Sequence, residues 1–159
     1  MLNIKTSRGV TLIELMVGLT IMAFLLLSGA PSLTEWIRNS QIRSAAESIM
    51  TGLHHARTEA VKRNGSARFQ LTSSLENDCA LSNSGRNWVV NLTASTTPEG
   101  NCANATSDTV APQMVQKSVA STSTGITVAA SQSVVSFNGL GQQTPATNPA
   151  TTIGTVTID

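Results

Sequence analysis

The stretch SRGVTLIELMVGLTIMAFLLLSGAPS, residues 7–32, decides how this chain is organised. Its apolar part runs from Val10 to Ala30 and contains a single charged side chain, Glu14. As a helix, these roughly 21 residues would extend for about 31 Å, which matches the hydrocarbon core of a bilayer. Lys5 and Arg8 precede the run, so we predict a cytoplasmic N-terminus with the remainder outside.

Three interpretations of this segment compete. A cleaved secretory signal would explain the small residues at 28–30, but Pro31 would then follow the cut, and such signals have a shorter apolar region of about 7–15 residues. A simple membrane anchor leaves Glu14 unexplained, because placing a carboxylate deep in lipid costs about 3 kcal/mol. In the third interpretation, a cut between Gly9 and Val10 creates a charged amine that pairs with Glu14 of an adjacent subunit's helix.

The sequence RG-VTLIELMVGLTIMAFLL resembles the type IV prepilin signature, which has a short basic leader, a glycine, a hydrophobic residue, Thr-Leu-Ile-Glu and an apolar helix. In that family a prepilin peptidase cuts after the glycine and methylates the new N-terminus. The resemblance implies that Gly9 ends the leader, that Val10 becomes the N-terminus, and that Glu14 serves subunit assembly. Pro31 stands where many pilins carry a helix-kinking proline. The chain departs from the family at Val10, where phenylalanine is usual.

Residues 32–64 are expected to continue the same helix beyond the membrane, after a bend at Pro31. Apolar residues recur there at helical spacing: Leu33, Trp36, Ile37, Ala45, Ala46, Ile49, Met50, Leu53, Ala56 and Ala60. The sequence KRNG at 62–65 ends the pattern with basic residues and Asn-Gly, which predicts a helix C-terminus.

Residues 65–159 change to short β-branched runs bounded by Gly, Asn, Pro and Ser, at 67–74, 87–95, 125–131, 133–139 and 154–159. They predict one or two small antiparallel sheets against the outer half of the helix, with 94–113 as an irregular loop. The expected fold is α+β and pilin-like. The expected divisions are a leader at 1–9, a transmembrane and filament-assembly helix at 10–31, a periplasmic helix half at 32–64, and a β-rich domain at 65–159.

Cys79 and Cys102 are the two cysteines, and both have polar, loop-like surroundings. They would close a loop of about 24 residues with one disulfide, worth about 3 kcal/mol on the chain-entropy model. The alternative is a pair of free cytosolic thiols, but the export-type N-terminus favours an oxidising compartment. We predict no metal and no cofactor, since no histidine lies near the cysteines. His54 and His55 are adjacent, so on a helix they point about 100° apart.

Charge and motifs argue against nucleic-acid binding and against catalysis. The chain has 10 basic and 9 acidic residues, and its last basic residue is Lys117. Arg57, Lys62 and Arg63 form one small basic cluster near the expected helix end, where they complement the helix dipole; an anionic ligand is the alternative. No nucleophile motif or phosphate-cradling loop is present, so we expect a structural protein rather than an enzyme.

The sequence VVSFNGLGQ at 134–142 carries a second resemblance. Phe137 to Gly141 resemble a Phe-x-x-Gly element of pilin-like proteins that include the type II secretion minor pseudopilin GspH and the minor pilins FimT and FimU. A strand-end phenylalanine before a glycine turn also explains it. FimT-type proteins suggest a basic Gly-Arg-x-Arg element near the C-terminus, whereas this chain ends in TTIGTVTID. Two matches to a glycosylation pattern begin at Asn91 and Asn104.

Together these features predict a minor type IV pilin that helps to prime pilus assembly at the filament tip, in the manner of FimU. A GspH-like minor pseudopilin is the alternative, and a DNA-binding FimT-like pilin is disfavoured. The resemblance implies that its partners are other minor pilins, a major pilin or pseudopilins, the prepilin peptidase and the inner-membrane assembly platform. It also implies an inner-membrane location with a periplasmic domain.

Overall fold

The computed structural model describes residues 9–92, 97–119, 126–144 and 156–158, and it leaves the side chains of 28–32 aside. The chain divides into two compact units, Met1–Asn39 and Ser40–Asp159, which we describe separately. The long helix α1, Leu12–Arg63, contributes residues to both units. It begins two residues after the expected start at Val10 and ends one residue before Asn64, so the predicted helix is confirmed.

In the first unit, α1 exposes apolar side chains over its whole circumference. The exposed residues are Leu12, Ile13, Leu15, Met16, Val17, Leu19, Ile21, Met22, Phe24, Leu25, Leu26, Leu27, Leu33, Trp36 and Ile37. A helix that meets the length and hydropathy of a membrane span is not found among the residues that the structure describes.

The C-terminal end of α1 is closed by its own backbone. Asn64 adopts a left-handed conformation with φ of 45°. The Gly65 N–H donates to the Ala60 carbonyl at 3.0 Å, and the Asn64 N–H donates to the Val61 carbonyl at 3.1 Å. These two bonds form a Schellman motif, which satisfies carbonyls that a helix end leaves open. The KRNG sequence therefore ends the helix as predicted, with Asn64 rather than Gly65 in the left-handed position.

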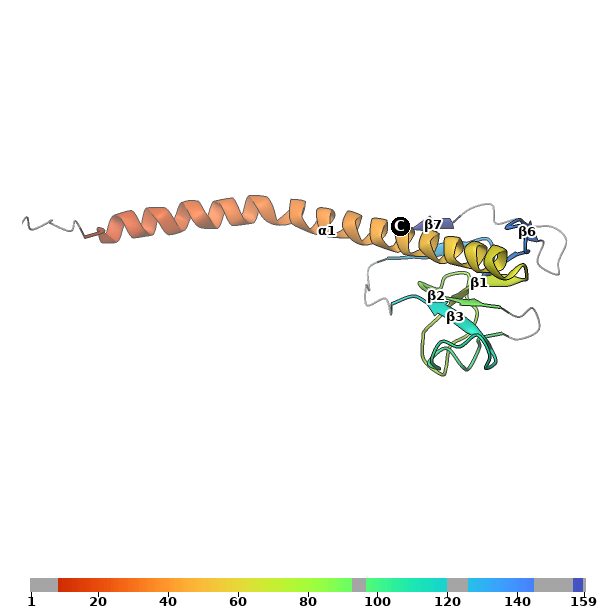
Figure 1. Ribbon diagram of the computed structural model, residues 1–159. Helices are drawn as coiled ribbons and strands as arrows, with labels where there is room; N and C mark the ends of the chain where they lie inside the picture. Colours follow the sequence, from red (N-terminus) through yellow and green to blue (C-terminus); the bar gives the residue numbers. More distant parts are fainter. Residues whose placement is uncertain (1–8, 93–96, 120–125, 145–155, 159) are drawn as a thin grey trace, which may run out of the picture. The chain divides into compact units, whose positions relative to one another are not determined.

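The described residues of the second unit form two antiparallel sheets beside the last part of α1 (Figure 1). The larger sheet has five strands in the order β3-β2-β1-β5-β6, and the smaller one pairs β4 with β7. The strands are β1 Ala67–Thr72, β2 Asn87–Asn91, β3 Met114–Lys117, β4 Val128–Ala130, β5 Val134–Phe137, β6 Gln143–Thr144 and β7 Val156–Ile158. The fold is α+β and pilin-like, as expected from the sequence.

One face of the larger sheet packs against α1 and forms the main core. The core residues are Ile49 and Ala56 of α1 with Phe69, Leu71, Trp88, Val90, Val128 and Val135 of the strands. The rings of Phe69 and Trp88 lie 5.9 Å apart, centre to centre. They contact the helix at Gly52, where an added Cβ would lie only 2.6 Å from the Phe69 ring. This glycine therefore lets the helix backbone approach the two aromatic rings.

The opposite face of the sheet is covered by loops rather than by a helix. Val89 of β2 and Met114 of β3 pack there with Cys79, Cys102 and the partly buried Leu75. This smaller cluster places the two cysteines inside the protein, both less than 4% exposed.

Two strands were not expected from the sequence. β3, Met114–Lys117, follows the predicted irregular loop and pairs with β2. β6, Gln143–Thr144, is a two-residue strand that pairs with β5. The expected runs at 87–95 and 154–159 lie partly outside the described part of the chain. The first residue of the run at 125–131 also lies outside it.

Candidate functional site

The predicted cleavage position lies just before α1. Gly9 and Val10 are exposed and precede the helix. The Thr11 hydroxyl accepts a hydrogen bond from the Glu14 backbone N–H at 3.3 Å, so Thr11 caps the helix N-terminus. Glu14 lies in the first turn, where a carboxylate is favoured by the helix dipole. The sequence reasoning missed this cap, although Thr-x-x-Glu before an apolar run is its usual signal.

The first unit has an apolar surface that no other part of the described chain covers. Leu12 is 80% exposed and Leu27 is 75% exposed, at opposite ends of the described apolar run. A helix that is apolar all round is normally buried in a membrane or in a protein core. Glu14 lies exposed on this same surface, one turn from Val10.

Pro31 falls within α1 by the helix bounds. Its side chain is outside the described residues, so the predicted bend at Pro31 stays a prediction.

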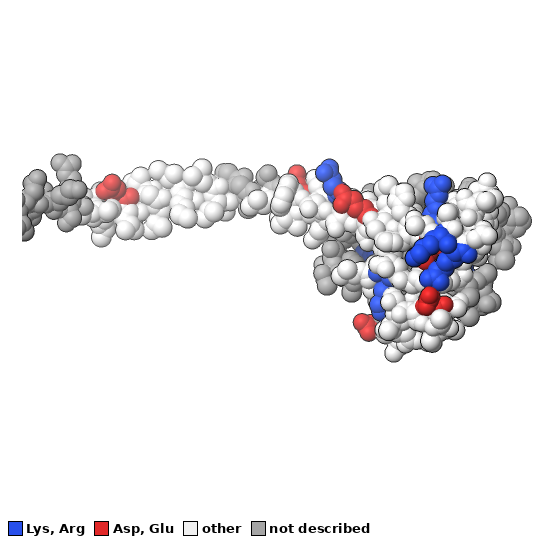
Figure 2. Space-filling model, in the orientation of Figure 1, with Lys and Arg blue, Asp and Glu red and all other residues white. Residues whose placement is uncertain are grey.

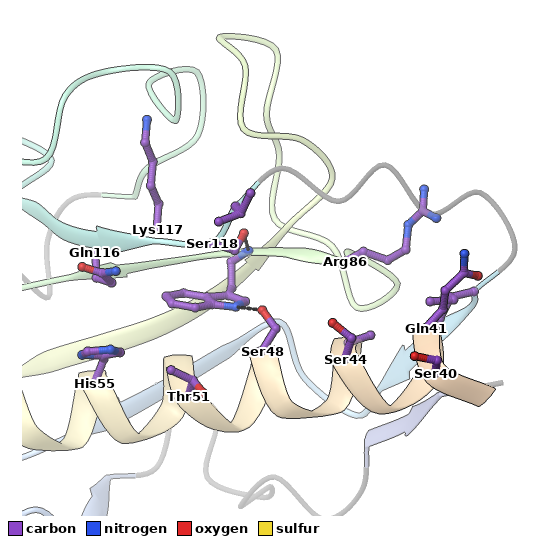
Figure 3. A pocket seen from close by; sticks show the side chains of 14 residues that line it. Ser40, Gln41, Ser44, Ser48, Thr51, His55, Arg86, Gln116, Lys117 and Ser118 are labelled. Carbon is purple, nitrogen blue, oxygen red and sulfur yellow. Dashed lines mark hydrogen bonds between the residues drawn. The ribbon is translucent and has the colours of Figure 1, made fainter. Parts of the chain in front are cut away.

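A groove lined mainly by polar residues lies between α1 and the β2–β3 edge of the larger sheet (Figure 3). It encloses about 630 Å³. Its lining residues are Ser40, Gln41, Ser44, Ala45, Ser48, Thr51, His55, Arg86, Trp88, Gln116, Lys117, Ser118, Val119 and Ile126. The Trp88 indole N–H donates to the Ser48 hydroxyl at 3.0 Å, which ties the sheet to the helix at the groove floor. Because Trp88 is only 4% exposed, its ring offers no stacking surface to a ligand.

The predicted disulfide is present in the structure and joins Cys79 to Cys102. Lys117 of β3 holds the same loop, because its Nζ donates to the Cys102, Ala103 and Asn104 carbonyls at 3.1, 3.3 and 3.1 Å. The disulfide thus joins the β1–β2 loop to the β2–β3 loop, and the Lys117 ammonium group attaches the β2–β3 loop to strand β3.

Replacing Cys79 and Cys102 together with serine is expected to lower the free energy of unfolding by about 3 kcal/mol, since the unfolded chain regains the freedom of the closed loop. Urea unfolding of the full chain in detergent, followed by tryptophan fluorescence, measures the change. Reducing the wild-type protein should lower its midpoint to that of the variant. Equal midpoints for oxidised wild type and variant would show that the disulfide adds no stability to the folded protein.

A charged network joins the end of α1 to the loop of residues 97–113. Arg63 contacts the Glu59 carboxylate at 2.8 Å and the Asp108 carboxylate at 3.3 Å, and Lys62 lies 3.5 Å from Glu59. The hydrogen bond from Arg63 holds the pKa of Glu59 below its usual value of 4.5, and the same bond raises the pKa of Arg63. Two members of the predicted basic cluster, Lys62 and Arg63, therefore have carboxylate partners.

The network predicts an acid-sensitive contribution to stability. Because the pKa of Glu59 is lower in the folded state, its ionised form stabilises the fold at neutral pH, and this stability is lost as pH falls through about 4.5 and below. Unfolding midpoints of Glu59→Gln should therefore fall less steeply with acid than those of wild type. Glu47→Gln, an exposed acid of the same helix, serves as control. Parallel pH profiles for wild type and Glu59→Gln would contradict the prediction.

The stretch Phe137 to Gly141, which resembles the Phe-x-x-Gly element, forms the turn between β5 and β6, and it packs on the end of α1. The Asn138 N–H donates to the Gln142 carbonyl at 3.0 Å, and the Gly141 N–H donates to the Asn138 carbonyl at 2.8 Å. A Cβ added at Gly139 would lie 2.6 Å from the Asn64 side chain, so only glycine fits against the helix cap. The element resembling the pilin-like group thus has a structural role here.

The two histidines and the two glycosylation matches lie in different parts of the fold. His55 lines the groove, whereas His54 lies on another face of α1 beside Arg57. The described residues contain no cluster of three or more potential metal ligands. Asn91 is fully buried in β2, which makes the first glycosylation match inaccessible, while Asn104 is exposed.

These features define a class of protein. An apolar N-terminal helix precedes a compact unit in which the rest of that helix packs on small antiparallel sheets, and this is the arrangement of a pilin or pseudopilin. The N-terminal sequence agrees, because residues 4–30 match the prokaryotic N-terminal methylation motif.

Residues 45–159 match the family described as type II transport protein GspH, and the chain belongs to that family. It is a minor pilin or pseudopilin of the type IV pilin-like group. Comparison with curated proteins and with solved structures gives no match. Proteins of these families are structural subunits that assemble with other pilins after processing by a prepilin peptidase, and the N-terminal motif implies membrane anchoring.

Proposed function

We propose that the chain is a minor type IV pilin, a low-copy subunit that helps to prime pilus assembly at the filament tip. The observation that carries this proposal is the apolar first part of α1, whose side chains are exposed all round in the single chain. Packing against the helices of other subunits would bury this surface and provide the driving force for assembly. The second unit has its own core and would form the external part of the subunit.

In this proposal residues 1–9 are a leader that the prepilin peptidase removes. Gly9 and Val10 are exposed ahead of the helix, and a side chain at Gly9 would meet no atom within 4 Å, so access to this bond is open. The mature chain is expected to begin at N-methylated Val10, and intact-mass measurement of the protein from its host checks this. A chain that still begins at Met1, or one cut near Ala30, would contradict the proposed processing.

The new N-terminal amine would pair with Glu14 of a neighbouring subunit. The pair would be shielded from water by apolar side chains, where the attraction between opposite charges is only weakly screened. It would fix the register between helices, because an apolar surface alone permits sliding. Residues 10–31 would form this assembly segment, with a bend at Pro31, and 32–64 and 65–159 would form the periplasmic part.

The proposed location before assembly is the inner membrane, as a single-pass protein with a cytoplasmic N-terminus and a periplasmic domain. Lys5 and Arg8 support this orientation. The disulfide supports an oxidising compartment for the domain. The proposed partners are other minor pilins, the major pilin and the inner-membrane assembly platform.

A second candidate is a minor pseudopilin of a type II secretion system. It is favoured by the description of the matching family as a type II transport protein. DNA capture in the manner of FimT is disfavoured, because the sequence after Lys117 contains no basic residue.

Deleting the gene in its host and measuring both surface pili and protein secretion tests the proposal. Loss of pili and twitching with intact secretion is expected for a pilus-priming minor pilin. Intact pili with failed secretion would instead assign the protein to the secretion pseudopilus. Complementation with the full-length gene controls for effects on neighbouring genes.

A further inference from the structure

The last turns of α1 carry an exposed surface beside the charged network of Glu59, Arg63 and Asp108. We define this helix-end surface by six residues: His54, Arg57, Thr58, Val61, Lys62 and Leu140. The first five line a shallow pocket of about 410 Å³ and follow helical spacing, so they share one face of α1. All five are exposed.

The sixth residue, Leu140, belongs to the turn at 138–142, which approaches this face of α1 through Gly141. Gly141 has a φ of 71°, and a Cβ added there would lie 2.9 Å from the Val61 side chain and 3.1 Å from Arg57 Nε. The Asn138 side-chain oxygen accepts the N–H groups of Leu140 and Gln142 at 3.1 and 3.0 Å, which fixes the turn. Leu140 precedes Gly141 in this turn and is 76% exposed, and Val61, which Gly141 approaches, is 51% exposed.

The surface therefore has an apolar centre and a basic rim. His54, Arg57 and Lys62 line the pocket, and no carboxylate does. Lys62 shares Glu59 with Arg63, whereas Arg57 forms no ion pair with any carboxylate in the described part of the chain. Figure 2 shows Lys and Arg side chains gathered on this part of the second unit, with acidic side chains beside them.

We propose that the helix-end surface docks a neighbouring subunit of the same filament through a patch that has an apolar centre and carboxylates around it. This inference rests on the proposed role as a filament subunit. An apolar core with a charged rim is the usual composition of a protein–protein interface. A nucleic acid is a poorer fit, because Glu59 and Asp108 would repel a polyanion that extends past the pocket. Rim charges such as Arg57 chiefly set partner choice, while Val61 and Leu140 supply buried apolar area.

The test uses the full-length chain co-expressed with the tagged major subunit of each candidate filament, the pilus and the secretion pseudopilus, followed by co-purification in mild detergent. Arg57→Glu/Lys62→Glu and, separately, Leu140→Glu are expected to reduce the recovered complex at least about tenfold. Arg38→Glu/Arg43→Glu, with the same change in net charge on the same helix, should leave recovery unchanged. Because the altered side chains are exposed, the variants should remain folded, and among the described residues the only ion pair lost is that of Lys62 with Glu59, a surface pair worth about 0–1 kcal/mol.

The outcomes separate the two proposals. If wild type co-purifies with a major subunit and all variants do so equally, the helix-end surface is not the docking site, while the filament role stands. If wild type recovers neither major subunit and is also absent from sheared filaments, the filament role itself fails. A gel shift with duplex DNA that is lost only in Arg57→Glu/Lys62→Glu, with subunit recovery intact, would reassign the surface to nucleic acid.

Discussion

Replacing Glu14 with leucine is expected to exclude the chain from filaments while its leader is still removed after Gly9. In the proposed assembly the variant would lose the carboxylate that pairs with a neighbour's N-terminal amine, and that amine would then be enclosed by apolar helices without a counter-charge. Removing one member of a buried ion pair leaves the other charge buried without a partner, which costs about 3–5 kcal/mol. A tenfold fall in incorporation needs only about 1.4 kcal/mol, so the chain should disappear from sheared filaments and accumulate in the membrane fraction.

The helix itself should survive this change, which makes the result specific. The cap at Thr11 uses the backbone N–H of residue 14, not its side chain, and leucine is a good helix former. Glu14→Asp keeps the charge and should restore part of the incorporation, whereas Glu14→Gln should not. Wild-type levels of Glu14→Leu in filaments would show that the apolar surface alone governs assembly and would remove the argument for the ion pair.

Much of the fold could be predicted because local and tertiary preferences agree. The helix was predicted from apolar spacing and ends where KRNG permits a left-handed residue. The strands β1, β2 and β5 are rich in branched and aromatic residues, which fit a pleated surface. By contrast, β3 contains Gln116 and Lys117, and it is a strand because β2 offers a free edge to pair with.

The candidate site could be predicted only where its signal is contiguous in sequence. Gly9, Val10 and Glu14 belong to one short motif, and the Thr11 cap could have been recognised from the same letters. The helix-end surface could not be predicted, since Val61 and the turn that carries Leu140 are far apart in the chain and are brought together by the backbone approach of Gly141 to Val61. The pairing of Arg63 with Asp108 is likewise a consequence of how the loop of residues 97–113 folds back on α1.

The two units differ in what stabilises them. The second unit buries Phe69, Leu71 and Val90 within its own chain, so its stability is a property of the subunit. The apolar helix of the first unit has its side chains exposed, so its burial depends on a membrane or on other subunits. Substitutions in the buried core of the second unit should therefore affect unfolding, and substitutions in the apolar helix of the first should affect assembly.

A valine at Gly52 tests that division and is expected to cause the largest loss of stability. Its Cβ would lie 2.6 Å from the Phe69 ring and 2.7 Å from the Trp88 ring, and both rings are buried. Overpacking of a core typically costs about 1–3 kcal/mol and sometimes more. Since contact with both rings must be relieved by moving α1 off the sheet, we expect a loss of about 3 kcal/mol or more, measured by urea unfolding of the full chain in detergent.

Gly18→Val is the matched control: the glycine lies in the same helix, and an added Cβ meets no atom within 4 Å. Its unfolding midpoint should equal that of wild type, and an equal midpoint for Gly52→Val would mean that the helix does not pack against Phe69 and Trp88 at this distance.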